Sequence, residues 1–149
     1  MRVLAIDYGA RRLGLALSDE EGAFAFPAGA LERRGLRRDV AQLAALARER
    51  GVASVVVGLP LHMDGREGPE ARAARAFAAA LREASGLPVD TFDERWTTRE
   101  AERALAERGP GGHRARARKG ELDEVAATLL LRAWLARRRA EGARAAESG

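Results

Sequence analysis

The feature that most constrains the fold is the opening run, residues 2–9 (RVLAIDYG), an apolar stretch that ends in a carboxylate and then a glycine. Its alternation predicts a β-strand with Val3, Ala5 and Asp7 on one face and Leu4 and Ile6 on the other. Asp7 then shares a face with core residues, where an unpaired charge is costly. A bound cation would remove that cost, although a strand-end aspartate that only forms a turn explains a lone Asp-x-Gly about equally well.

Further apolar patterns along the chain predict an α/β fold with a central five-stranded mixed sheet and helices on both faces. The short link between the first two strands indicates an antiparallel hairpin, and Pro27 restricts the third strand to a sheet edge or a bulge. The remaining strands are expected at residues 13–18, 24–30, 53–58 and 88–92, and helices at residues 37–50, 67–85, 97–108 and 121–139.

Length and composition indicate a single domain. The 149 residues are 46% hydrophobic and 32% charged, and no apolar run reaches the length of a membrane span. We expect one domain over residues 1–140 and a frayed tail over residues 141–149. The chain has no cysteine, which excludes disulfides, thiolate zinc sites and cysteine nucleophiles. No signal peptide is expected, so a cytoplasmic location is the default.

The basic residues are almost all arginine, because Lys119 is the only lysine in a chain of net charge +4. The planar guanidinium matches phosphate oxygens. A biased genomic base composition explains the same excess, so the arginines carry information only where they cluster.

Three acidic positions stand out because of their neighbours: Asp7, the pair Asp93 and Glu94 after the last strand, and Asp123 in the first turn of the last helix. Apolar residues follow Asp123 at helical spacing, so it is expected to face the protein, although the helix dipole alone favours an acid there. If the first strand is central, all three positions meet at one sheet edge. Carboxylates gathered at one point repel unless divalent cations lie between them, and oxygen ligands favour Mg²⁺ or Mn²⁺. Two such ions about 4 Å apart promote phosphodiester hydrolysis.

The chain also resembles a known family. Four motifs follow one another in the order of the YqgF/RuvX family: residues 6–9 (IDYG), residues 58–65 (GLPLHMDG), residues 93–98 (DERWTT), and Lys119-Gly120 followed by Asp123. The resemblance implies a ribonuclease H-like fold, similar to that of the RuvC Holliday-junction resolvases. It also implies a nuclease that processes the 5′ end of pre-16S ribosomal RNA, with ribosome assembly intermediates as further partners.

By position, the resemblance implies that Asp7, Glu94 and Asp123 are the catalytic and metal-binding acids, and that Asp93 and Asp64 support them. His62 stands where the family commonly has asparagine, and Trp96 where leucine is usual. His62 is a candidate donor of a hydrogen bond to phosphate, or a plain loop residue.

A site built from acids needs basic surroundings to hold a polyanion. Basic residues lie next to each acid in the sequence, and they are candidate contacts for nucleic acid. These residues are Arg11, Arg12, Arg95, Arg114, Arg116, Arg118 and Lys119. For those in the loop before Asp123, the alternative is a loop that is only exposed to solvent.

Two other functions stay open. The same chemistry would suit a four-way DNA junction, which requires paired sites and therefore a symmetric dimer, but no dimer face is readable in the sequence. The Asp7 hairpin with Gly14 is also similar to the phosphate-binding hairpin of actin-like ATPases, which use two such domains. A non-catalytic module that binds nucleotide or nucleic acid is the third possibility.

Overall fold

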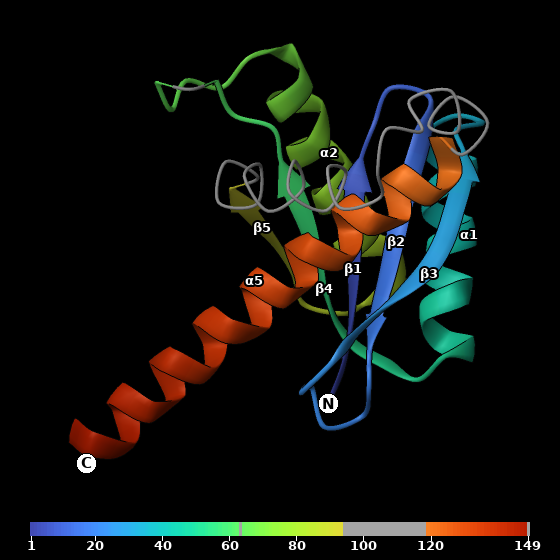
Figure 1. Ribbon diagram of the computed structural model, residues 1–149. Helices are drawn as coiled ribbons and strands as arrows, with labels where there is room; N and C mark the ends of the chain where they lie inside the picture. Colours follow the sequence, from blue (N-terminus) through green and yellow to red (C-terminus); the bar gives the residue numbers. More distant parts are fainter. Residues whose placement is uncertain (63, 94–118, 149) are drawn as a thin grey trace, which may run out of the picture.

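The computed structural model describes residues 1–62, 64–93 and 119–148 (Figure 1). Its centre is a five-stranded sheet with the strand order β3-β2-β1-β4-β5. The strands are β1 (Arg2–Tyr8), β2 (Arg12–Ser18), β3 (Ala25–Glu32), β4 (Val52–Leu59) and β5 (Val89–Asp93). The described helices are α1 (Leu36–Glu49), α2 (Pro69–Ser85) and α5 (Lys119–Ser148).

The sheet is mixed, as the sequence predicts. β1 pairs antiparallel with β2 through the predicted hairpin and parallel with β4, so it is hydrogen-bonded on both sides. α1 and α2 are the crossovers that bring β4 and β5 parallel to β1. β3 is an edge strand, and its pairing with β2 is irregular near Pro27, which confirms the expected effect of that proline.

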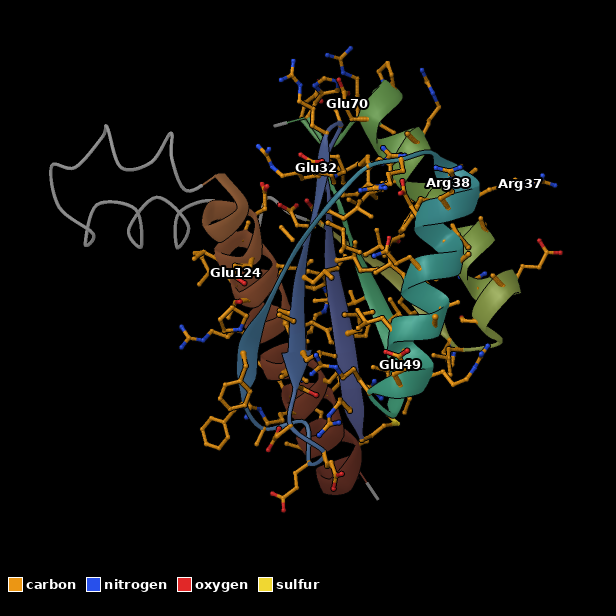
Figure 2. The ribbon with its side chains drawn as sticks, turned by 90° about the vertical axis from the view of Figure 1, so that its right-hand side faces the viewer. Glu32, Arg37, Arg38, Glu49, Glu70 and Glu124 are labelled. Atoms are coloured by element: carbon orange, nitrogen blue, oxygen red, sulfur yellow. The ribbon has the colours of Figure 1, made fainter. Side chains whose placement is uncertain are left out.

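Helices cover both faces of the sheet, and Figure 2 shows α5 on one side with α1 and α2 on the other. Alternation along β1 divides the core between these layers. Leu4 and Ile6 pack in the cluster that includes Phe77 of α2. Val3 and Ala5 pack in the cluster that includes Leu130 of α5. The predicted two faces of the first strand are therefore confirmed.

All three described helices begin at the same end of the sheet, where β1, β4 and β5 end (Figure 1). Helix N-termini carry partial positive charge, so this end of the molecule favours anions. None of these helices is long and apolar enough to span a membrane.

The predicted end of the last helix near residue 139 was wrong, because α5 continues to Ser148. The added residues are mostly alanine, arginine and glutamate, with one glycine and no proline, and such residues extend a helix readily. Residues 141–145 are exposed, and whether they fray in solution stays a prediction. The helix expected over residues 97–108 and the basic loop after it lie outside the described residues.

Candidate active site

Two of the three predicted catalytic acids lie on one face of the sheet, at the end where the helices begin. Asp7 is half-buried near the end of β1, in the same row as Val3 and Ala5, and its register partner on β2 is Gly14. A Cβ atom built on Gly14 would lie only 2.0 Å from the backbone oxygen of Asp123. The missing side chain therefore lets the Asp123 backbone near the start of α5 rest on β2, one strand away from Asp7.

Asp123 already has a cationic partner. The Nε atom of Arg12 donates a hydrogen bond to its Oδ2 atom at 2.9 Å, and the two side chains are 28% and 31% exposed. Because both groups touch solvent, this ion pair contributes little to stability. Its relevance is instead to the site, because the Asp123 carboxylate already binds a positively charged group, the Arg12 guanidinium.

The third predicted acid, Glu94, lies outside the described residues, as do Arg95, Arg114, Arg116 and Arg118. β5 carries the chain as far as Asp93, which pairs with Leu59 at the end of β4. Within the described ranges, no group of three or more histidine, aspartate or glutamate side chains is placed to hold a metal ion. A three-acid site thus depends on Glu94, the next residue after β5.

The structure describes two of the candidate supporting acids, Asp93 and Asp64. On β5, Phe92 belongs to the cluster on the α5 side, so alternation puts the Asp93 side chain on the opposite face from Asp7. The Asp64 carboxylate binds Arg66 through its backbone N–H at 3.0 Å and its Nε atom at 2.6 Å. Supporting roles for Asp93 and Asp64 stay predictions.

His62 lies against the start of α2. A Cβ atom on Gly68, the residue before α2, would lie 2.6 Å from the Nε2 atom of His62. A packing role at this helix start therefore stands beside the predicted contact with phosphate.

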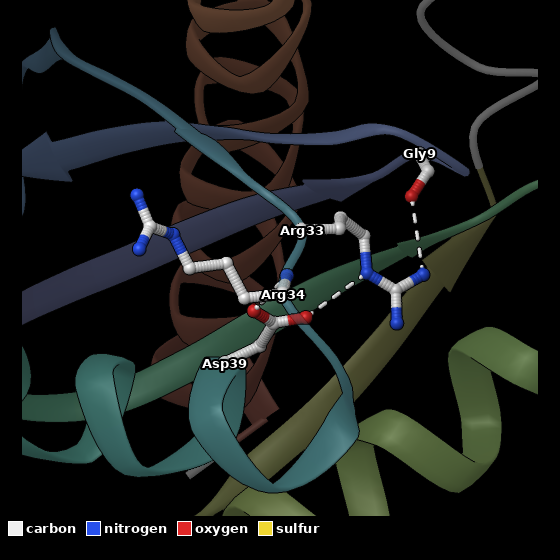
Figure 3. A network of polar contacts seen from close by, with 4 residues as sticks. All are labelled: Gly9, Arg33, Arg34 and Asp39. Carbon is white, nitrogen blue, oxygen red and sulfur yellow. Dashed lines mark hydrogen bonds and ion pairs between the residues drawn. The ribbon is translucent and has the colours of Figure 1, made fainter.

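Sequence reasoning missed a buried ion pair beside the Asp7 turn (Figure 3). Asp39, in the first turn of α1, is only 2% exposed. Its Oδ2 atom accepts a hydrogen bond from Arg33 Nε at 3.1 Å, and its Oδ1 atom accepts one from the Arg34 backbone N–H at 3.0 Å. The Nη1 atom of Arg33 donates to the Gly9 carbonyl at 3.4 Å, and its guanidinium lies 4.5 Å from the centre of the Tyr8 ring.

This buried network fixes the tip of the β1–β2 hairpin from the α1 side. The backbone N–H of Arg33 also donates to the carbonyl of Arg11 at 2.8 Å, and that of Gly9 donates to Arg12 at 3.1 Å. The Tyr8 ring packs against Phe77 of α2, with centroids 5.1 Å apart. The residues directly after Asp7 are therefore held by β2, the β3–α1 loop and α2. Four arginines around one aspartate (residues 33–39, RRGLRRD) were the only signal for this in the sequence.

The strand order and the helices on both faces define an α/β protein with a ribonuclease H-like fold. The fold is shared with the solved structure of Thermus thermophilus RuvC, with a TM-score of 0.55 and 19% identity over 92% of this chain and 96% of that one. A fowlpox virus resolvase, solved with Holliday junction DNA, has a TM-score of 0.56 and 9% identity over 92% of this chain and 98% of that one.

The family follows from the sequence. A family model described as "RuvX: Holliday junction resolvase" matches residues 1–137, and the chain belongs to the RuvX family. A relative from Anaeromyxobacter dehalogenans strain 2CP-C is 47% identical over 93% of this chain and 98% of its own length. A relative from Moorella thermoacetica is 44% identical over 92% of this chain and 96% of its own length. Both carry the name "Putative pre-16S rRNA nuclease".

Proposed function

We propose that this chain is a metal-dependent nuclease that hydrolyses phosphodiester bonds in a precursor of 16S ribosomal RNA. The observation that carries the proposal is the arrangement of Asp7 and Asp123 on one face of the sheet, separated by Gly14. The names of relatives similar over nearly the whole chain supply the substrate class. A cytoplasmic location accords with this substrate.

In this proposal Asp7, Asp123 and Glu94 hold the divalent cations, with Mg²⁺ or Mn²⁺ favoured by their hard oxygen ligands. The donor set fits, because Gly14 lets the Asp123 backbone approach the strand next to Asp7 and Asp123 already contacts a positive group. When bound, the ions supply an activated water and stabilise the leaving oxygen. Asp93, Asp64 and His62 are the candidate supporting groups.

Arg12 has two tasks in the proposed site. It neutralises Asp123 when no other cation does so, at 2.9 Å. Its planar fork also matches the oxygens of a phosphate, so it is suited to contact substrate once Asp123 has another partner. Arg11, exposed at the hairpin tip, lies beside it. The other proposed contacts are Arg95, Arg114, Arg116, Arg118 and Lys119.

The test is cleavage of an end-labelled precursor RNA in Mg²⁺ by the wild-type protein and by three separate variants, Asp7→Asn, Glu94→Gln and Asp123→Asn. Each variant is expected to lose cleavage, because each removes one proposed metal ligand. Glu49→Gln, an exposed change at the far end of α1, is the matched control (Figure 2). Three acid variants that cleave as fast as the control would overturn the proposal.

The fold likeness to RuvC and the description of the matching family favour one alternative substrate, a four-way DNA junction. Resolving a junction needs two active sites related by symmetry. Sedimentation in the presence of a junction tests this alternative, and a monomer on the junction would exclude it. Tight ATP binding without any nuclease activity would instead favour the non-catalytic module.

A further inference from the structure

We propose that Arg34, Arg37 and Arg38 form a second contact surface, here called the α1 arginine surface, for the sugar-phosphate backbone of the RNA. This inference rests on the proposed function and extends it from the cleavage site to the path of the substrate. The RNA would run from the Asp7 side of the sheet, over the β1–β2 hairpin tip, to the start of α1.

The first observation is that these arginines are free to bind an anion. All three side chains are exposed, and within the described residues none of them forms a hydrogen bond or an ion pair. Two exposed arginines elsewhere do pair with acids, Arg66 with Asp64 and Arg75 with Glu67.

The acid closest in sequence cannot neutralise the surface. Asp39 is buried, and its two oxygens are used by Arg33 and by the Arg34 backbone. The local excess of positive charge therefore faces solvent, where it attracts a polyanion. The start of α1 adds the positive end of the helix dipole.

The second observation is shape. Arg34 and Arg38 line an open hollow of about 490 Å³ between the edge strand β3 and α1, together with Glu32 and Gln42. Figure 2 shows Arg37 and Arg38 extending from α1 at the end of the molecule where Glu32 and the start of α2 also lie. Glu32 is the one acid in this lining, and the two guanidinium groups outnumber it.

The third observation is a rigid link to the proposed active site. Arg33 joins the β3–α1 loop to the hairpin tip through its backbone bond to Arg11, at 2.8 Å, and its side-chain bond to Gly9. From β1 to β3 the sheet spans two strand spacings, or about 10 Å, and α1 lies one layer further, on the face opposite Asp7. An RNA that passes over the hairpin tip could therefore contact Asp7 on one face and the α1 arginine surface on the other.

The experiment compares two double variants at opposite ends of α1. Arg37→Ala/Arg38→Ala removes two charges from the α1 arginine surface, and Arg48→Ala/Arg50→Ala removes two exposed charges from the opposite end. Affinity for a long stem-loop RNA and for a short oligonucleotide is measured over a range of salt concentrations. For the stem-loop, the first variant is expected to lower the slope of log affinity against log salt by about one to two units.

The short oligonucleotide, which covers only the acids, should bind equally well to both variants, and the Arg48/Arg50 pair should behave like wild type. Arg37→Lys/Arg38→Lys keeps the charge and should retain most of the slope. Equal losses in the two alanine variants, or no stem-loop binding by the wild type, would overturn the inference. If the wild type binds RNA without cleaving it, only the nuclease proposal is overturned. The salt dependence of binding by the variants would still test the α1 arginine surface.

Discussion

Gly14 controls how closely α5 approaches the sheet. The contact leaves no space for a side chain, because a Cβ atom would lie 2.0 Å from the Asp123 backbone oxygen and 3.0 Å from its Cβ atom. Backbone cannot yield as the end of a flexible side chain does. The glycine at this position therefore determines how closely Asp123 can approach the strand next to Asp7.

Gly14→Ala should displace the first turn of α5 and lower the free energy of unfolding by about 1–3 kcal/mol, the usual effect of overpacking. RNA cleavage should fall as well, since Asp123 moves. Urea denaturation and a cleavage assay check this. The control is Gly142→Ala, on an open part of α5, which should raise stability by up to about 1 kcal/mol. A fully stable, active Gly14→Ala protein would contradict the close contact.

The pair formed by Arg33 and Asp39 makes a second residue-level prediction. Asp39→Ala leaves the guanidinium of Arg33, which is 19% exposed, without its partner, and it also frees the Arg34 backbone N–H. The expected loss is about 3 kcal/mol of unfolding free energy. Denaturant titration measures it against Glu49→Ala, an exposed change that should stay within about 0.5 kcal/mol of wild type. Equal stability of the two variants would show that the buried pair contributes nothing.

Asp19 gives a prediction for pH. Backbone N–H groups of Phe24 and Ala23 donate to its Oδ1 atom, and these bonds, that of Phe24 first, lower the pKa of the carboxyl below its ordinary value of 3.8. The stabilisation is present above that ordinary value and is lost as the pH falls through the lowered pKa. Asp19→Ala should therefore be less stable than wild type at pH 7, with the gap closing in acid. A gap that stays constant in denaturation curves from neutral to acid pH would contradict this.

Among the elements, α5 has two different parts. Its middle is core, with Leu130 and Leu131 buried against β1, whereas residues 141–145 are exposed and lie beyond the sheet in Figure 1. Helical packing on one face explains the first part, and favourable helix propensity explains the second.

Removing residues 141–149 should change the free energy of unfolding by less than about 1 kcal/mol, because residues 141–145 are exposed and so is the ion pair between Glu141 and Arg137. The helical circular dichroism signal should fall if these turns are helical in solution, and should not change if they are frayed. Leu131→Ala, in the buried part, should cost about 2–5 kcal/mol. Similar losses in both proteins would show that the exposed turns contribute to packing.

The elements show where sequence reasoning works and where it stops. Apolar alternation gave the strands and the two faces of β1, and Pro27 gave the sheet edge, because burial leaves a periodic trace in the sequence. The role of Asp39 left no such trace, since its partner Arg33 reaches the Gly9 carbonyl only through the tertiary fold. The approach of α5 to Gly14 was likewise invisible, because residues 14 and 123 are adjacent only in space.

For the whole molecule, the proposed metal site depends on bringing distant segments together. Asp7→Asn should abolish the heat of Mg²⁺ or Mn²⁺ binding in calorimetry. Without metal it should leave the free energy of unfolding unchanged or raised, because one of several like charges is removed. Glu49→Gln should retain metal binding. Undiminished binding by Asp7→Asn would place the ions elsewhere.

The central position of β1 has a consequence for motion. A strand with partners on both sides releases its amide protons only when the surrounding sheet opens, whereas an edge strand such as β3 exchanges them through local fraying. Asp7 directly follows the residues, up to Ile6, that pair on both sides and should be slowest to exchange with deuterated water. Its carboxylate should therefore stay in position while the edge of the domain opens locally.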